Sequence, residues 1–166
     1  LNMLTFGEAD LGTNLKLLSQ ALAAFEAAGY LVGQSRITSN LGFAYQSLGL
    51  YRRARRLHVR AEEIHRATGL VDQVYAALEL ATVEMEIGHL KAAHAYLAEA
   101  AAAVATIPQD RFLHFYLPMV SGRLAMLGGD FPAALRHYKL VVKLLRNGEQ
   151  PAFEMNALAR LAHVHL

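Results

Sequence analysis

The chain has 166 residues, of which 54% are hydrophobic, and its 16 basic and 14 acidic side chains leave a formal net charge of +2. This balance gives no general case for binding nucleic acid or a membrane surface, and no apolar run reaches the roughly 20 residues that cross a bilayer. The sequence has no cysteine, which excludes disulfides, thiolate metal sites and cysteine nucleophiles and favours a cytoplasmic location.

Helical periodicity runs through the chain, and no segment keeps the alternation typical of a strand. Residues 15–28 predict a helix that follows a turn near Gly12. Between Leu41 and Leu48, apolar residues recur at three and four positions, which predicts one buried helical face. A second helix then starts near Tyr51. The local unit is therefore two helices joined by a tight turn.

This unit recurs with a period close to 40 residues. The predicted turn glycines are Gly49, Gly88 and Gly129, with spacings of 39 and 41 residues. Seven positions before each glycine lies a small residue, and the series continues at the C-terminal end: Gly42, Ala81, Gly122 and Ala162. We expect the small residue to let two helices approach closely and the turn glycine to end the first helix. A repeated helix pair of this kind predicts a stacked array.

The segment NLGFAYQSLGLYRRARRLHVRA resembles the tetratricopeptide repeat (TPR). The residues that match its pattern are Leu41, Gly42, Ala44, Tyr45, Gly49, Tyr51, Ala54 and Ala61, whereas His58 stands where the pattern has a large aromatic residue. The resemblance implies an all-α fold, a TPR-like superhelix built as a solenoid of antiparallel helix pairs. Repeats of about 40 residues resemble those of bacterial signal-transduction and transcriptional regulators.

We expect one repeat domain over residues 1–166, with units at residues 1–33, 34–70, 71–108, 109–149 and a partial unit at 150–166. Because the chain opens with Leu1 and lacks a targeting pattern, we expect it to be a fragment of a larger protein. Pro118 predicts a kink or a fresh helix start, since proline lacks the amide donor and clashes with the preceding turn. Asp130 and Pro132 predict a capped helix start after Gly129.

No motif of an enzyme is present, and we expect no catalytic activity, no cofactor and no metal site. The eight histidines do not follow a metal-binding pattern, because His58 and His65 are seven positions apart and His163 and His165 are two apart. Glu84 occupies a slot of the repeat that should be partly buried. A carboxylate there needs a hydrogen-bonding partner or a raised pKa.

In the TPR family the first helix of each pair lines the concave face, where a protein or peptide partner lies. The resemblance therefore implies a ligand-binding set on the first helices of this chain: Arg36, Asn40, Phe43, Gln46, Tyr75, Glu79, Met85, Tyr116, Met119, Arg123, Met126, Asn156 and Arg160. Thr82 and His163 fall on the same predicted face. Asparagine and arginine can pair with a peptide backbone or carboxylate, and tyrosine and methionine supply adaptable apolar contacts.

Two other functions stay open. The partial last unit presents Leu158, Leu161, Ala162 and His165 without a second helix, which favours self-association or a homo-oligomer through the C-terminal end. The cluster RRARR at Arg52 to Arg56 could bind nucleic acid, although no basic counterpart recurs in the next repeat. The function that we expect from the sequence is a protein- or peptide-binding scaffold or sensor module of a larger bacterial regulatory protein.

Overall fold

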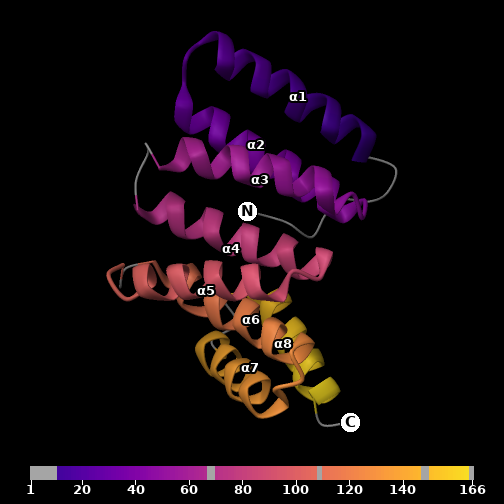
Figure 1. Cartoon of the computed structure of the whole chain (residues 1–166), viewed down its shortest axis with the longest axis vertical. Coiled ribbons are helices and arrows are strands. Elements are labelled where there is room, and N and C mark those ends of the chain that lie inside the picture. The colour runs from indigo at the N-terminus through magenta and orange to yellow at the C-terminus, as the bar shows by residue number, and fades with distance from the viewer. Residues whose placement is uncertain (1–10, 67–69, 108–109, 147–149, 165–166) are drawn as a thin grey trace. The chain divides into compact units, whose positions relative to one another are not determined.

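The computed structural model describes residues 11–66, 70–107, 110–146 and 150–164, which form eight α-helices and no strand (Figure 1). In chain order the helices are α1 (Leu11–Ala27), α2 (Leu31–Ser47), α3 (Tyr51–His65), α4 (Leu70–Ile87), α5 (Leu90–Val104), α6 (Arg111–Leu127), α7 (Phe131–Leu145) and α8 (Pro151–Val164). Helices that follow one another pack in consecutive pairs, so the predicted all-α repeat fold is confirmed. Among the described residues, no helix is long and apolar enough to cross a membrane.

Four tight turns share one backbone geometry. A glycine with positive φ lies at each: Gly29 (+65°), Gly49 (+72°), Gly88 (+89°) and Gly129 (+77°). At Gly49 the glycine amide donates to the carbonyl of Gln46 (3.0 Å), and the amide of Leu50 donates to the carbonyl of Tyr45 (2.9 Å). The other three turns repeat these bonds at the same spacing. The pattern is a Schellman-type helix end, which favours glycine because other residues rarely adopt positive φ.

In two of the repeats, the small residue seven positions before the turn glycine lies against a ring on the following helix. A Cβ atom added at Gly42 would come within 2.5 Å of the His58 ring, and one added at Gly122 would come within 2.7 Å of the Tyr138 ring. His58 and Tyr138 are fully buried. Glycine at these positions therefore lets α2 approach α3, and α6 approach α7, more closely than alanine would.

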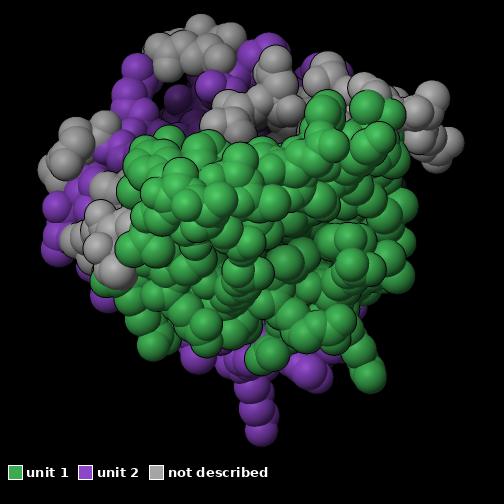
Figure 2. All heavy atoms as spheres, turned by 90° about the horizontal axis from the view of Figure 1, so that it is seen from above, with its two compact units in different colours: residues 1–76 green, residues 77–166 purple. Residues whose placement is uncertain are grey.

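The chain divides into two compact units, residues 1–76 (unit 1) and residues 77–166 (unit 2), and the division falls within α4 (Figure 2). In unit 2, α6, α7 and α8 enclose a hydrophobic core of Phe115, Met119, Ala134, Tyr138, Val141, Leu145 and Ala157. An aromatic group of Phe112, Tyr116 and Phe153 packs against this core. The buried residues of α7 recur at three- and four-residue spacing, as an amphipathic helix requires.

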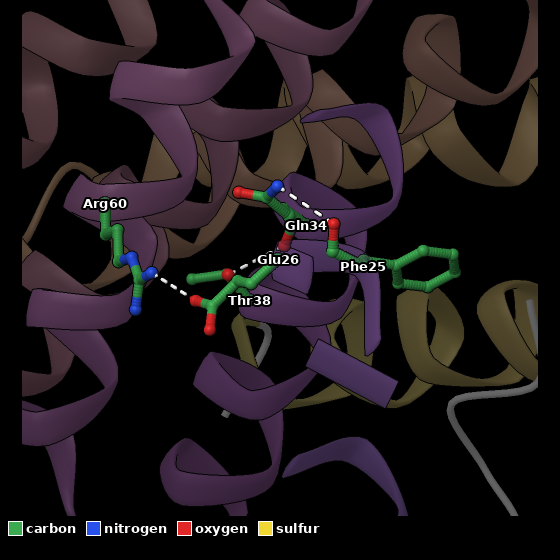
Figure 3. A network of polar contacts seen from close by, with 5 residues as sticks. All are labelled: Phe25, Glu26, Gln34, Thr38 and Arg60. Atoms are coloured by element: carbon green, nitrogen blue, oxygen red, sulfur yellow. Dashed lines mark hydrogen bonds and ion pairs between the residues drawn. The ribbon is translucent and has the colours of Figure 1, made fainter. Parts of the chain in front are cut away.

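In unit 1, polar contacts join the first three helices (Figure 3). Arg60 on α3 pairs with Glu26 on α1 at 2.6 Å, and the side-chain amide of Gln34 on α2 donates to the carbonyl of Phe25 at 3.1 Å. Thr38 donates to the carbonyl of Gln34 at 2.7 Å. The side chains of the Arg60–Glu26 pair are 50% and 41% exposed, so solvent weakens this ion pair and it adds little stability.

One expectation about local structure is wrong, and a second is wrong in one of its two alternatives. Gly12 lies in the first turn of α1 rather than in a turn before it, and any helix that precedes α1 would fall outside the described residues. The second concerns Pro118, where no fresh helix starts, because α6 runs from Arg111 to Leu127 as one helix with Pro118 inside it. A kink of α6 at Pro118 stays a prediction. Pro118 is buried, and Phe115 and Met119 beside it belong to the core of unit 2. The burial of Phe115, Pro118 and Met119 thus stabilises the continuous helix by more than the missing backbone hydrogen bond of the proline costs.

Asp130 caps α7 as expected. Its carboxylate accepts the amide of Ala133 at 2.9 Å, and Pro132 lies in the first turn of the helix, where a missing amide donor costs nothing. Asp110 caps α6 in the same way, accepting the amide of Leu113 at 3.1 Å. The starts of α6 and α7 are therefore both fixed by aspartate side chains.

Candidate functional site

The predicted binding set, named the first-helix face, lies on α2 and the start of α4 in unit 1 and on the rest of α4, α6 and α8 in unit 2. Its predicted residues differ in exposure. Arg36 and Asn156 are exposed, and the partly exposed residues are Asn40, Phe43, Gln46, Tyr75, Tyr116, Arg123, Met126 and Arg160. Glu79, Met85 and Met119 are buried, and Met119 is a core residue of unit 2. In this arrangement the last three support the face from within rather than offering a surface to a ligand.

In unit 1 the predicted residues of α2 are held by packing. The Phe43 ring contacts the buried His58 ring edge-on, with centroids 5.2 Å apart. The side-chain oxygen of Gln46 is buried and has no hydrogen-bond partner among the described residues. A buried amide oxygen without a donor is costly, and a donor supplied by a ligand would remove that cost.

In unit 2, Arg123 on α6 forms an ion pair with Glu86 on α4. The two side chains are 28% and 23% exposed, so the pair is partly shielded from solvent but can still be reached. The sequence predicted that Arg123 would recognise a carboxylate, and in this structure the carboxylate comes from the chain itself. Any acidic ligand of Arg123 must therefore compete with Glu86.

Tyr116 on α6 is tied to α4 by a short polar chain. Its phenol is hydrogen-bonded to the side chain of Thr82, whose hydroxyl donates to the carbonyl of Leu78 at 2.8 Å. Burial, with a smaller contribution from the carboxylate of Glu79, raises the pKa of Tyr116 to about 12, although Thr82 and Arg123 act in the opposite direction. Tyr116 is thus a neutral hydrogen-bonding group at physiological pH.

Arg160 on α8 lies near the phenol of Tyr138. Its Nε donates to the Oδ1 atom of Asn156 at 2.7 Å, and among the described residues it has no acidic partner. Burial raises the pKa of Tyr138, while the guanidinium groups of Arg160 and Arg123 lower it and offset part of the effect.

The hydroxyl of Tyr138 is buried without a well-aligned hydrogen-bond partner among the described residues. Arg160 lies beside it and acts on its pKa, but not with the alignment of a full hydrogen bond. Buried hydroxyls are usually satisfied. The hydroxyl of Tyr138 is an exception among the described residues.

Sequence reasoning missed Glu86 and Tyr138. Glu86 lies four residues after Thr82, so it belongs to the same helical face, and extending that face by one turn would have found it. Tyr138 follows Gly122 by the 16 positions that separate His58 from Gly42. The spacing within the repeat could therefore have predicted that Tyr138 is a buried core residue, but not that it has a functional role.

Glu84 has a hydrogen-bonding partner, as the sequence analysis predicted for a carboxylate at a buried position. Its side chain is 1% exposed, and its Oε2 atom lies 2.7 Å from Nδ1 of His89, which is 60% exposed. His89 lies in the turn between α4 and α5. The buried carboxylate of Glu84 is thus contacted by a side chain from the turn that follows its own helix.

Among the described residues, no group of three His, Asp or Glu side chains is arranged to hold a metal ion.

The arginine cluster on α3 is largely exposed. Arg52, Arg53 and Arg56 are exposed, Arg55 is partly exposed, and the Arg53 guanidinium lies 4.0 Å above the Tyr45 ring. Glu62, which could have neutralised the cluster, pairs with Arg66 at 2.6 Å instead. Stacking on Tyr45 occupies one face of Arg53.

The predicted C-terminal surface on α8 is partly apolar. Met155 is 69% exposed and Leu158 is 47% exposed, while Ala162 is exposed and Leu161 is partly buried. His165 lies outside the described residues. The expected exposure of this face is therefore seen for Leu158 and Ala162.

Two hollows lie on the described residues of unit 2. In unit 2, a cleft of about 400 Å³ is lined by residues of α5, α6 and α7, including His94 and His137. A second, more open hollow lies on α5 around Leu90 and His94. No residue of the predicted binding set lines either one.

No protein-family model and no curated protein matches the sequence. A solved structure similar to this chain is the crystal structure of the apo form of RapI, with a TM-score of 0.71 and 13% sequence identity. The similarity covers 95% of this chain and 44% of RapI, so the chain spans less than half the length of that protein. The likeness shows a shared helical-repeat fold.

Proposed function

We propose that the chain is a TPR-like module that binds a protein or peptide through the first-helix face. It acts within a larger bacterial, cytoplasmic regulatory protein and has no catalytic role. The observation that carries the proposal is the partly exposed ion pair of Arg123 with Glu86 in unit 2. A surface arginine that already engages a carboxylate has the geometry needed to recognise an acidic group of a partner.

The character of the face supports this function. Its reachable side chains combine arginine and asparagine with tyrosine, phenylalanine and methionine, a mixture that is typical of peptide-binding surfaces. The supporting helices are rigidly packed, because Gly42 and Gly122 bring their helices close to buried rings. A rigid scaffold lowers the entropic cost of binding.

Self-association is the second candidate, and Met155 and Leu158 favour it. Both are apolar and strongly exposed on α8, and exposed apolar patches often mark protein contacts. Light scattering over a range of protein concentrations tests this function directly. A mass that rises with concentration, and that returns to the monomer value after Met155→Ser with Leu158→Ser, would support it.

An array of short random peptides, probed with the labelled protein, tests the main proposal. We expect a subset of peptides to bind, and the Asn40→Ala/Arg123→Ala variant to lose that binding while its circular dichroism spectrum stays helical. A salt-dependent RNA-binding assay runs in parallel, because nucleic-acid binding through Arg52 to Arg56 would depend steeply on salt. RNA binding without any peptide binding would replace the proposal by the nucleic-acid function.

A further inference from the structure

Helix α7 in unit 2 carries positive charge on its outer side and no acidic side chain. Between Phe131 and Leu145 the sequence has Arg136, Lys139 and Lys143 but neither Asp nor Glu, and all three basic side chains are exposed. None of them forms an ion pair with a carboxylate of the described residues. A solvated helix face ordinarily carries charges of both signs, so the outer side of α7 has an uncompensated positive charge.

Two leucines lie beside these cations. Leu140 is 44% exposed and Leu144 is 41% exposed, although both are large apolar side chains. Arg136 precedes Leu140 by four positions and Lys143 follows it by three, so the three side chains are neighbours on the helix surface. The opposite side of α7 already packs in the core of unit 2. Packing within unit 2 therefore leaves the two leucines partly uncovered.

The leucines continue one edge of the cleft of about 400 Å³ that is lined by α5, α6 and α7. His137 lines this cleft from α7, and Leu140 and Leu144 follow it by three and seven positions on the same side of the helix. Leu97 on α5 and Leu124 on α6 supply apolar walls. A half-apolar cleft thus runs into an exposed apolar ridge.

We use the name second-helix surface for this cleft together with Leu140, Leu144, Arg136, Lys139 and Lys143. The edge that α7 contributes extends for about 16 Å from the first cleft residue of that helix to Leu144, at about 1.5 Å per residue. About three turns of a partner helix have this length. Apolar side chains spaced by three and four positions would then contact the cleft and the leucines, while carboxylates beside them meet the three cations.

Other kinds of partner fit this surface less well. An extended peptide needs free backbone groups to pair with, but those of α5 and α7 are bonded within their helices, and no strand edge is present among the described residues. RNA would pair with the cations, but its phosphates would lie against Leu140 and Leu144 and gain nothing from them. A helix satisfies its own backbone groups and can present both apolar and acidic side chains.

We infer that the second-helix surface docks an acidic amphipathic helix of a partner protein. It is an interaction surface in addition to the first-helix face, because no residue of the predicted binding set lines the cleft or belongs to α7. The inference therefore does not depend on the proposed peptide-binding function. Apolar side chains of the partner helix occupy the cleft, and its carboxylates pair with the cations of α7.

Synthetic helices of defined charge test the inference on the complete chain. The probe is a fluorescent peptide with leucine at positions i, i+3, i+4 and i+7 and with glutamate and alanine elsewhere. A second peptide has lysine in place of glutamate, and a third has the composition of the first in an order that scatters the leucines around the helix. We expect the acidic probe to bind at least about tenfold more tightly than either of the others in fluorescence anisotropy.

Charge reversal assigns the contact to α7. Lys139→Glu with Lys143→Glu should abolish binding of the acidic probe and create binding of the lysine peptide, because the surface then has the opposite sign. The matched control is Arg52→Glu with Arg56→Glu on α3, which makes the same change of net charge at two exposed arginines with the same spacing. The control should still bind the acidic probe. Circular dichroism checks that both variants stay helical.

Two uncharged substitutions test the apolar part of the contact. Ala98→Phe places a large ring in the cleft from the exposed side of α5, and Leu140→Ser removes one of the exposed leucines. Each should weaken the acidic probe several-fold without changing the net charge. Leu17→Ser on α1 is the control, because Leu17 is 58% exposed and lies in unit 1.

The outcomes keep this inference apart from the proposed function. Equal effects of the two charge reversals, or no effect of Ala98→Phe and Leu140→Ser, would mean unspecific attraction and contradict it. Loss of the acidic probe in the Asn40→Ala/Arg123→Ala variant would place the peptide on the first-helix face, which supports the proposed function and rejects the second surface.

Two further results would also reject the second-helix surface. If the acidic probe does not bind, the inference fails while the proposed function, which random peptides test, is unaffected. If RNA or vesicles of phosphatidylglycerol bind in a way that Lys139→Glu with Lys143→Glu abolishes, and the acidic probe does not bind, the surface serves a polyanion or a membrane instead.

Discussion

The guanidinium of Arg123 on α6 pairs with the carboxylate of Glu86 on α4, although the two residues are 37 positions apart in the chain. The pair joins two first helices within unit 2. It also gives the first-helix face an arginine whose charge is already compensated. A partner therefore gains from Arg123 only the difference between its own carboxylate and that of Glu86, which favours selectivity over affinity.

Gly122→Ala should destabilise the protein by about 1–3 kcal/mol, because the new methyl group would meet the buried Tyr138 ring. The higher helix propensity of alanine, about 1 kcal/mol, offsets part of this cost. Gly12→Ala on α1 is the matched control, since its Cβ would meet no atom within 4 Å. Urea unfolding measures both, and equal effects of the two substitutions would contradict the close-approach role of Gly122.

A second substitution should rescue Gly122→Ala. In the preceding repeat, Ala81 and Leu97 occupy the positions equivalent to Gly122 and Tyr138, and both are buried. Tyr138→Leu should therefore cost less in the Gly122→Ala background than in the parent protein. A double-mutant cycle measures this coupling, and strict additivity would show that the two positions do not share one contact.

Gly129→Ala should cost about 1 kcal/mol, because the φ of Gly129 is +77° and alanine is strained there. The neighbouring Gly128 is the control. It has a φ of −82°, and a Cβ there would lie 3.4 Å from the nearest atom, the carbonyl oxygen of Leu124. Gly128→Ala should be close to neutral. Thermal unfolding of the two variants compares adjacent glycines that differ mainly in backbone conformation.

Alkaline pH should destabilise the protein through Tyr116. Its pKa is raised from 10 to about 12 in the folded chain, so its contribution is complete below pH 10 and is lost as pH rises from 10 towards 12. At about 1.4 kcal/mol per pH unit, the loss approaches about 3 kcal/mol. Tyr116→Phe should flatten this part of the stability curve. A variant that loses stability as steeply as the parent over this range would contradict the assignment.

His89→Ala should lower the free energy of unfolding by about 1–2 kcal/mol, because it removes a hydrogen-bonding partner of the buried Glu84. His94→Ala serves as the control, since His94 is exposed on the neighbouring helix α5. His89→Gln should recover part of the loss by offering a donor from the same position. Denaturant titration at neutral pH distinguishes the three variants.

The fold could be predicted from the sequence because its signals are local. Gly49, Gly88 and Gly129 mark turns whose backbone needs positive φ, and Gly42 and Gly122 mark close approaches. At Pro118 the predicted alternative of a fresh helix start is wrong, because a local rule cannot weigh one lost hydrogen bond against burial supplied by other helices. Tertiary packing decided the outcome at that position.

The candidate site was less accessible to sequence reasoning. Periodicity assigned Arg123 to the predicted binding set but could not reveal its pairing with Glu86, because that contact depends on how two helices of different repeats pack. Periodicity also assigned Met119 to the ligand, although the side chain lies in the core. One face of a helix in a stacked array contacts both neighbouring helices and solvent. Which of its residues are buried and which are exposed is decided by the packing of the helices and not by the sequence period.

The affinity of the strongest peptide from the array, measured for three forms of the protein, tests the central claim most directly. These are the parent chain, the Asn40→Ala/Arg123→Ala variant, and a variant with alanine at Arg52, Arg53, Arg55 and Arg56. We expect the first-helix variant to lose at least about tenfold in affinity and the arginine-cluster variant to bind like the parent. Loss of binding in the cluster variant alone would place the partner on α3 and contradict the account.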